Sequence, residues 1–213
     1  MKIMTTAFAL AISTTMLASA VPVAAQQATS GPATPAQQKA AGDFINRIAA
    51  EAFGVLRDKS LSRDAARDRF RALLRSNFAI DEAGLRLIRR YRAPNSPIKL
   101  TPQQLAAYQA ALPDFLVNTY SDRLYDFASA EVSVVRTAPR GSRGDVDVFT
   151  RISDPKGGRP IDAIWQVKMG AQPLISNITV NGVNVALTQE ADFTAYIEKN
   201  GFDALVDFMR KAK

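Results

Sequence analysis

"IDAIWQVKMGAQPLISNITVNGVNV", residues 161–185, decides the fold class, because apolar and polar side chains alternate along both of its halves. An alternation with a period of two is typical of β-strands, in which successive side chains point to opposite faces of a sheet. Trp165, the only tryptophan of the chain, lies on the apolar side of the first half. The segment therefore predicts two strands, each with one face against an apolar surface.

The rest of the chain adds two more strands and several helices. Apolar positions recur with the helical period before Ala130, and Pro113 inside the longest of these segments predicts a kink or a meeting of two helices. The turn residues Asp154-Pro155-Lys156-Gly157 favour antiparallel neighbours. The order predicts an α+β fold, with N-terminal and C-terminal helices packed on one face of a curved four-stranded antiparallel sheet. Helices are expected at 35–56, 62–78, 81–91, 102–127, from Thr188 to Gly201, and around 205–209; strands are expected at 131–137, 145–152, 161–169 and 174–183.

Residues 1–25 have the composition of a cleaved secretory signal peptide, with an early Lys2, an apolar middle and a small-residue ending. A membrane anchor is the alternative, but Ser, Thr and Pro interrupt the apolar run. Residues 26–40 are predicted to be a flexible tether and residues 41–213 a single domain. An exported domain of this size without cysteine suits the bacterial periplasm, where it can be stable without disulfides.

The composition narrows the possible chemistry. Histidine and cysteine are both absent, which excludes Ser-His and Cys-His nucleophiles and His-ligated metal sites. An enzyme would need carboxylates, lysine or tyrosine alone. Together with the export signal and the family resemblance described below, this leads us to expect no catalytic residues, no metal and no cofactor. Without Lys2, 26 basic and 20 acidic side chains remain, which gives a net charge of +6. This charge favours acidic partners or anionic membrane surfaces, but it does not identify a particular one. Nucleic acid is not expected in the periplasm.

Two groups of charged residues leave alternatives open. An isomerase-like enzyme on a cone-shaped α+β fold would need a carboxylate on the inward face of the sheet, and the alternation places Asp145, Asp147 and Asp162 on the polar side. The arginines of the second and third helices form either a solvated surface or a docking site for acidic partners or lipid headgroups. A protein-docking accessory subunit is thus a further hypothesis, with docking residues Arg67, Arg71, Arg89 and Arg90.

The chain resembles the MlaC family of periplasmic phospholipid-binding proteins, also called the toluene-tolerance auxiliary family, over nearly all of the mature sequence. The resemblance rests on four segments: FAIDEAGLRLIRRY (78–91), LTPQQLAAYQAALPDFLVNTYSDRL (100–124), ISDPKGGRPI (152–161) and ISNITVNGVNVALTQEADFTAYIEKNGFDAL (175–205). The chain departs from the family pattern at Asn177, Asn181 and Asn184, where Asp, Glu and Ser are usual, and in an apparent insertion at residues 93–99.

The resemblance implies a monomeric carrier that holds a glycerophospholipid as cargo in a cavity between helices and sheet. It also implies exchange with an inner-membrane ABC transporter complex that has an MCE-domain subunit, and with an outer-membrane lipoprotein–porin complex, which maintains outer-membrane lipid asymmetry. Tyr120 and the central strand positions match the family's pocket, and the other lining residues are inferred from the face on which they lie. The expected lipid-binding residues are Tyr108, Leu112, Phe115, Tyr120, Val146, Val148, Trp165, Val167 and Ile178.

Overall fold

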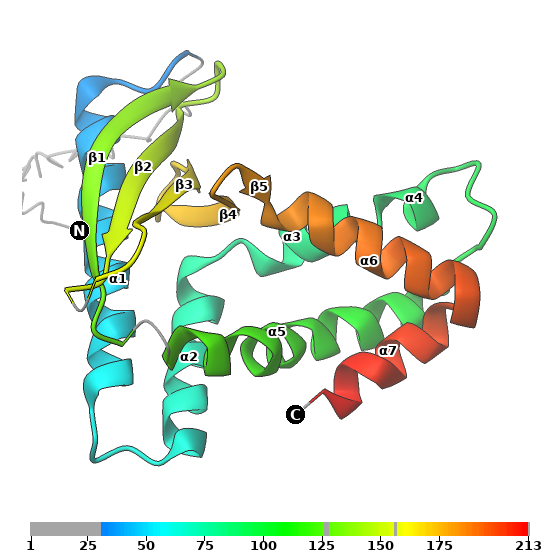
Figure 1. Ribbon diagram of the computed structural model, residues 1–213. Coiled ribbons are helices and arrows are strands. Elements are labelled where there is room, and N and C mark those ends of the chain that lie inside the picture. The colour runs from blue at the N-terminus through cyan, green and yellow to red at the C-terminus, as the bar shows by residue number, and fades with distance from the viewer. Residues whose placement is uncertain (1–30, 126–127, 156, 213) are drawn as a thin grey trace, which may run out of the picture.

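The computed structural model describes residues 31–125, 128–155 and 157–212, without the side chains of residues 121–124. The predicted signal peptide lies outside the described residues. Figure 1 shows α1 beside the sheet and the helices α5, α6 and α7 extending away from it. The elements of the described chain are α1 (Pro35–Arg57), α2 (Arg63–Asn77), α3 (Ile80–Leu87), α4 (Arg89–Arg92), α5 (Pro102–Tyr125), β1 (Glu131–Arg140), β2 (Asp145–Ser153), β3 (Ile161–Lys168), β4 (Leu174–Val180), β5 (Val183–Asn184), α6 (Val185–Asn200) and α7 (Phe202–Lys211).

The strands form one antiparallel meander in the order β1-β2-β3-β4-β5. Val148 pairs with Trp165 and Trp165 pairs with Ile178, so these apolar side chains share one face, as the alternation predicts. The prediction of four strands is one short. Asn181 and Gly182 have φ values of 47° and 81°, and positive φ at both positions suits the two-residue turn that leads into β5. The predicted α+β class is confirmed.

Helix α1 covers the apolar face of the sheet at β1 and β2. A capping box begins it: Gln37 N–H donates to Thr34 Oγ1 over 3.3 Å, and Thr34 N–H donates to Gln37 Oε1 over 2.8 Å. Gly42 of α1 faces β1, where a Cβ would be in ordinary van der Waals contact with Cγ2 of Thr137 at 3.5 Å. The chain thus places its first helix, rather than α5, over β1 and β2.

The chain before α1 is bonded to the turn between β1 and β2. Gly31 N–H donates to the Ser142 carbonyl over 2.9 Å, and Gly144 N–H donates to the Gly31 carbonyl over 2.9 Å. Ala33 is buried. The tether predicted for residues 26–40 is therefore wrong for residues 31–40, which belong to the folded domain, while residues 26–30 lie outside the described part.

The helix predicted at 81–91 is two helices. Ile88 separates α3 from α4 with φ −115° and ψ 20°, which lie outside the α-helical region. The N-cap is Ala79 rather than Asp81, which lies in the first turn. The reason is a tertiary contact: Ala79 N–H donates to the Ile175 carbonyl over 2.9 Å, so the chain stays extended beside β4 until α3 begins.

The helices α5, α6 and α7 form a second unit beside the sheet. Helix α5 continues through Pro113, so two separate helices do not meet there, and α5 packs mainly on α7, α2 and α3. Helix α6 begins earlier than predicted. Its N-cap is Asn184, whose Oδ1 accepts a hydrogen bond from Leu187 N–H over 3.1 Å, and Thr188 lies within the helix.

An ion pair between α3 and β3 makes stability depend on pH. A hydrogen bond from Lys168 lowers the pKa of the Glu82 carboxyl below its ordinary value. Because the folded pKa lies below the unfolded one, the pair stabilises the protein at neutral pH, and this contribution is lost as the pH falls through the lowered pKa. Glu82→Gln should lower the free energy of unfolding near pH 7 by less than about 1 kcal/mol, since both side chains are partly exposed. Urea unfolding near pH 7 should detect this loss, and an equal loss at about pH 2 would contradict the assignment.

Candidate functional site

The buried apolar side chains of the described residues form three clusters rather than one contiguous core. The helical cluster joins α3, α5, α6 and α7 around Tyr108 and Phe193. The sheet cluster joins α1 to Val146 and Val148. The α1–α2 cluster joins these two helices to Val117 of α5. A domain usually has one contiguous core with smaller satellite clusters, so the junction of these three clusters is where apolar side chains of the described residues are left only partly buried.

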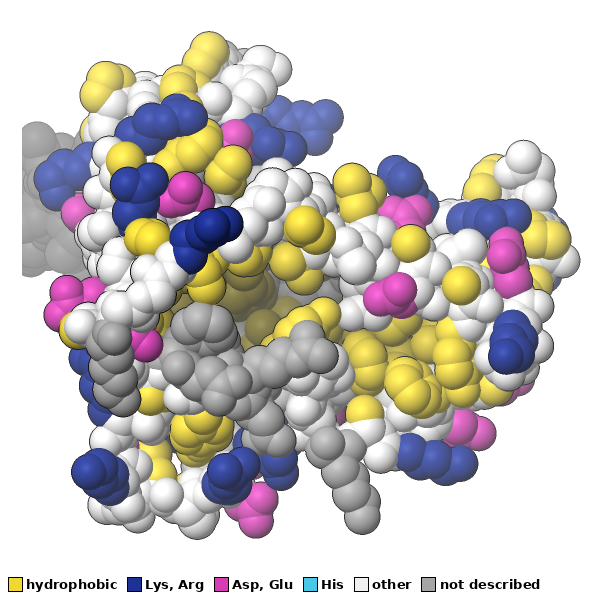
Figure 2. Space-filling view, viewed as in Figure 1, with side chains coloured by type: hydrophobic (Ala, Val, Ile, Leu, Met, Phe, Trp, Pro, Cys, Tyr) yellow, Lys and Arg dark blue, Asp and Glu magenta, His cyan; other side chains and the backbone are white. Residues whose placement is uncertain are grey.

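Half-buried apolar side chains lie at this junction. Phe78 packs against the helical and sheet clusters, and Leu74 packs against the helical and α1–α2 clusters. Trp165 and Ile178, opposite each other on β3 and β4, are only partly covered by the sheet cluster. Figure 2 shows a hollow between the sheet and the helices α5 and α6, with hydrophobic side chains at its bottom. We refer to this space as the hollow.

The polar groups on the sheet side of the hollow are hydrogen-bonded within the protein. The indole N–H of Trp165 donates to Thr150 Oγ1 over 2.9 Å, and the Thr150 hydroxyl donates to the Ala163 carbonyl over 3.4 Å. Thr150 itself is only 2% exposed. Because these groups already have partners, they need no water, and this wall of the hollow suits an apolar ligand.

The predicted lipid-binding residues fall into three sets. Trp165, Ile178 and Tyr120 are half-buried, the first two at the junction of the clusters and Tyr120 on α5, where its hydroxyl contacts Gln189 of α6. The second set is fully buried between the sheet and α1, and the third set is buried among the helices. The structure therefore does not bring all nine residues to one surface, and their contact with lipid stays a prediction. The second set is Val146, Val148 and Val167; the third is Tyr108, Leu112 and Phe115.

Tyr108 illustrates the third set. Its hydroxyl donates to the Gly84 carbonyl over 2.9 Å, and its ring lies 6.1 Å from Phe193 and 5.8 Å from Phe202, centroid to centroid. Burial raises the pKa of Tyr108, so the phenol stays a neutral hydrogen-bond donor. These contacts give Tyr108 a structural role in the helical cluster.

Three residues near the hollow were not among the expected ones. Leu74 and Phe78 lie in the helix predicted at 62–78, and only the structure shows that they lie between clusters. Gln189 is buried on α6, four residues before Phe193. A polar residue in the apolar stripe of a helix is the signal that could have indicated Gln189 from the sequence.

The four arginines expected to dock partners all have acidic neighbours within the chain. Arg89 Nε lies 2.8 Å from Glu190 Oε1, and Arg90 Nη1 lies 2.7 Å from Glu198 Oε1, which joins α4 to α6. Arg67 lies 3.8 Å from Asp64, and Arg71 Nε lies 2.5 Å from Asp114 Oδ1. Each of the four arginines thus has an ion pair within the chain. Their role in docking a partner stays a prediction.

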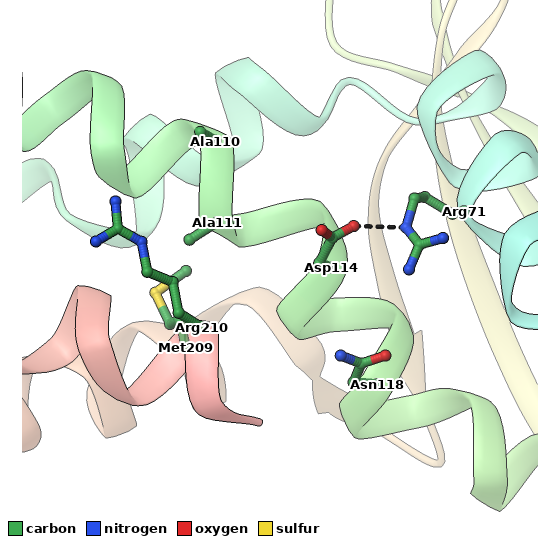
Figure 3. A pocket seen from close by; sticks show the side chains of 7 residues that line it. All are labelled: Arg71, Ala110, Ala111, Asp114, Asn118, Met209 and Arg210. Atoms are coloured by element: carbon green, nitrogen blue, oxygen red, sulfur yellow. Dashed lines mark hydrogen bonds and ion pairs between the residues drawn. The ribbon is translucent and has the colours of Figure 1, made fainter. Parts of the chain in front are cut away.

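The Arg71–Asp114 pair borders a pocket of about 260 Å³ between α2, α5 and α7, shown in Figure 3. The pocket also contains Asn118 and Arg210 beside Met209 and two alanines. Its lining is mixed in polarity, unlike the wall that Trp165 and Ile178 give to the hollow. We therefore place the candidate ligand site in the hollow.

The carboxylates considered for isomerase chemistry do not gather in the hollow. Asp147 lies 3.3 Å from Arg140, and Asp162 lies 2.9 Å from Arg151. Asp147 and Asp162 alternate with Val148 and Ala163, so they lie on the opposite face of the sheet. Among the described side chains, no group of three or more His, Cys, Asp or Glu could hold a metal ion. Within the same residues, no helix has the length and hydropathy to cross a membrane.

Comparison with known proteins identifies a matching protein family and a solved structure with a similar fold. The model of the MlaC protein family matches residues 46–211. Among solved structures, the chain is similar to a phospholipid-binding protein from Ralstonia solanacearum in complex with a phospholipid, with a TM-score of 0.66 and 16% sequence identity. The similarity covers 81% of this chain and 96% of the Ralstonia chain, and at this identity it shows a shared fold. No curated protein matches the chain.

Proposed function

The chain belongs to the MlaC family, and from this premise we propose that it is a non-enzymatic carrier that holds a glycerophospholipid with its acyl chains in the hollow. The observation that carries the proposal is the division of the apolar interior into three clusters around half-buried side chains such as Trp165 and Phe78. The fold shared with a phospholipid-bound protein supports the same cargo.

The energetics of hydrocarbon explain why such a carrier needs a hollow. Each buried CH₂ group is worth about 0.8 kcal/mol, so exposing two chains of about 16 carbons to water costs on the order of 20 kcal/mol. Free diffusion of the lipid through water is therefore negligible. An apolar hollow replaces the interior of the bilayer, and the free energy of transfer between the two becomes a small difference, as reversible exchange requires.

The place and the partners of the carrier are part of the proposal. The sequence of residues 1–25 and the absence of cysteine support export to the periplasm. There the protein would shuttle lipid as a monomer between an inner-membrane ABC transporter complex with an MCE-domain subunit and an outer-membrane lipoprotein–porin complex. Such transfer would maintain the lipid asymmetry of the outer membrane. Membership of the family supports these partners.

Native mass spectrometry of the protein purified from periplasm tests the proposal. We expect about one phospholipid per chain, and its fragmentation identifies the headgroup and the acyl chains. Delipidated protein should take up phospholipid again from vesicles and pass it to acceptor vesicles. A folded protein that neither binds nor exchanges phospholipid would refute the proposal.

Trp165 should report directly on the occupancy of the hollow, because it is the only tryptophan and is half-buried there. Loading delipidated protein with phospholipid should shift its fluorescence emission to shorter wavelength, since hydrocarbon replaces water beside the indole. Loading with a phospholipid brominated along its acyl chains should quench the emission.

The control moves the indole to the opposite face of the sheet. The double variant Trp165→Phe/Val135→Trp places it at a position where Val135 is 60% exposed. Brominated lipid should leave this emission unchanged. Equal quenching at both positions would mean that lipid adsorbs to the surface rather than entering the hollow.

A further inference from the structure

The buried face of α6 consists of apolar side chains except at its end nearest the sheet, where Gln189 places a carboxamide. Phe193 and Ile197 are both 2% exposed and belong to the helical cluster, where Phe193 lies 5.6 Å from Phe115, centroid to centroid. Gln189 comes one turn earlier on the same face and is 8% exposed. Figure 1 shows that this end of α6 adjoins the sheet, and α6 contacts β4 and β5, which border the hollow seen in Figure 2. Gln189 therefore marks the boundary between the helical cluster and the hollow.

Tyr120 fixes the orientation of the Gln189 side chain. The Tyr120 hydroxyl lies 3.1 Å from Gln189 Oε1 and donates to it, joining α5 to α6. The contact occupies one end of the carboxamide. The other end, Nε2, carries two N–H donors, has no hydrogen-bond partner among the described residues and is not one of their fully buried atoms, so it stays accessible to a ligand.

When lipid displaces water from the hollow, a donor enclosed by hydrocarbon without an acceptor costs about 1–3 kcal/mol. Leu or Met would fill the same volume on α6 without this cost, so packing alone does not account for a glutamine. A glutamine that is 8% exposed and keeps an accessible amide N–H beside an apolar hollow favours a ligand with an acceptor oxygen at this depth.

The proposed cargo supplies such an oxygen. Saturated acyl chains have no acceptor along their length, but each chain begins at an ester carbonyl. We infer that Gln189 Nε2–H donates a hydrogen bond to an acyl ester carbonyl of the bound phospholipid, with Tyr120 as the positioning residue. The inference rests on the proposed function and adds to it a preference for ester-linked over ether-linked lipids.

A phosphate oxygen is the other acceptor that a phospholipid contains. Placing the charged phosphate inside an apolar hollow costs far more than placing a neutral ester there, so the ester is the expected partner. The two acceptors are separated by comparing lipids that share a headgroup and differ only in the linkage.

The experiment is a competition between two lipids for delipidated protein. Dipalmitoyl phosphatidylethanolamine and its dihexadecyl ether analogue are supplied in equal amounts in mixed vesicles, and native mass spectrometry measures the ratio of the two complexes. A neutral hydrogen bond is worth about 0.5–1.5 kcal/mol, so the natural protein should prefer the ester lipid by about 2-fold to 13-fold. In Gln189→Leu the preference should fall to about one, because Leu offers no donor.

A matched control comes from the sheet. Gln166 is 9% exposed, close to Gln189 in burial, and its strand partners are Asp147 and Asn177. Because Gln166 alternates with Trp165 along β3, it lies on the face away from the hollow. Gln166→Leu should therefore keep the full preference for the ester lipid. Gln189→Met replaces Gln189→Leu if the latter does not fold, as judged by circular dichroism.

The outcomes separate the inference from the function. Equal binding of the ester and ether lipids by the natural protein would overturn the inference and leave the carrier function intact. A preference that persists in a folded Gln189 variant, which a phosphate contact would produce, would also overturn it. Failure of the natural protein to bind either lipid would overturn both.

Discussion

Ile178→Glu should abolish the copurification of phospholipid with the protein. Ile178 is half-buried opposite Trp165 at the junction of the clusters, so its replacement places a carboxylate in the wall of the hollow. A charge facing hydrocarbon without a partner costs several kcal/mol, whereas in the empty hollow water can solvate it. A difference of about 3 kcal/mol lowers lipid affinity more than a hundredfold. Native mass spectrometry and lipid extraction measure the loss.

The same substitution at an exposed position of the sheet is the control. Val135 lies at the irregularity between Val134 and Arg136 in β1 and is 60% exposed. Val135→Glu should keep about one phospholipid per chain. Circular dichroism and thermal unfolding establish that both variants fold. A folded Ile178→Glu protein with its full lipid content would show that the acyl chains lie elsewhere.

The sheet was predictable from the sequence because its determinants are local. Alternation along residues 145–152 and 161–169 predicts which side chains share a face, and the structure pairs Val148 with Trp165 accordingly. The short strand β5 was missed because it is only two residues long and its signal is the Asn181-Gly182 turn. Recognition of that turn would also have moved the start of α6 from Thr188 to the residues after Asn184.

The packing partners of each face were not predictable, because periodicity identifies an apolar face without identifying what covers it. Tyr108, Leu112 and Phe115 share a face of α5, and the chain covers that face with α3, α6 and α7 rather than with the sheet. Helix α1 covers β1 and β2 instead. For the same reason the boundary position of Gln189 depends on where α5, α6 and the sheet meet, which no local pattern specifies.

Gly84→Val should be strongly destabilising, because α3 and α5 touch at this glycine. A Cβ at Gly84 would lie 2.4 Å from Cδ2 of Leu112, and Leu112 is 1% exposed within the helical cluster, so it has little room to move. The Gly84 carbonyl also accepts the Tyr108 hydroxyl, so a displaced helix would weaken this bond. Overpacking of this kind costs about 3 kcal/mol, or about 6–12 °C in Tm for a chain of this size. Urea and thermal unfolding measure the loss.

Two further variants show whether the clash with Leu112 causes the loss. Gly54→Val makes the same change in α1, where a Cβ would meet nothing within 4 Å, and should alter stability by less than about 0.5 kcal/mol. Leu112→Ala alone should cost about 2–5 kcal/mol through the cavity that it creates. In the double variant Gly84→Val/Leu112→Ala, the new side chain fills part of that cavity, so the combined loss should be smaller than the sum by about 1 kcal/mol or more. If the loss of stability in the double variant equalled the sum of the two single losses, Gly84 would be required for a reason other than its contact with α5.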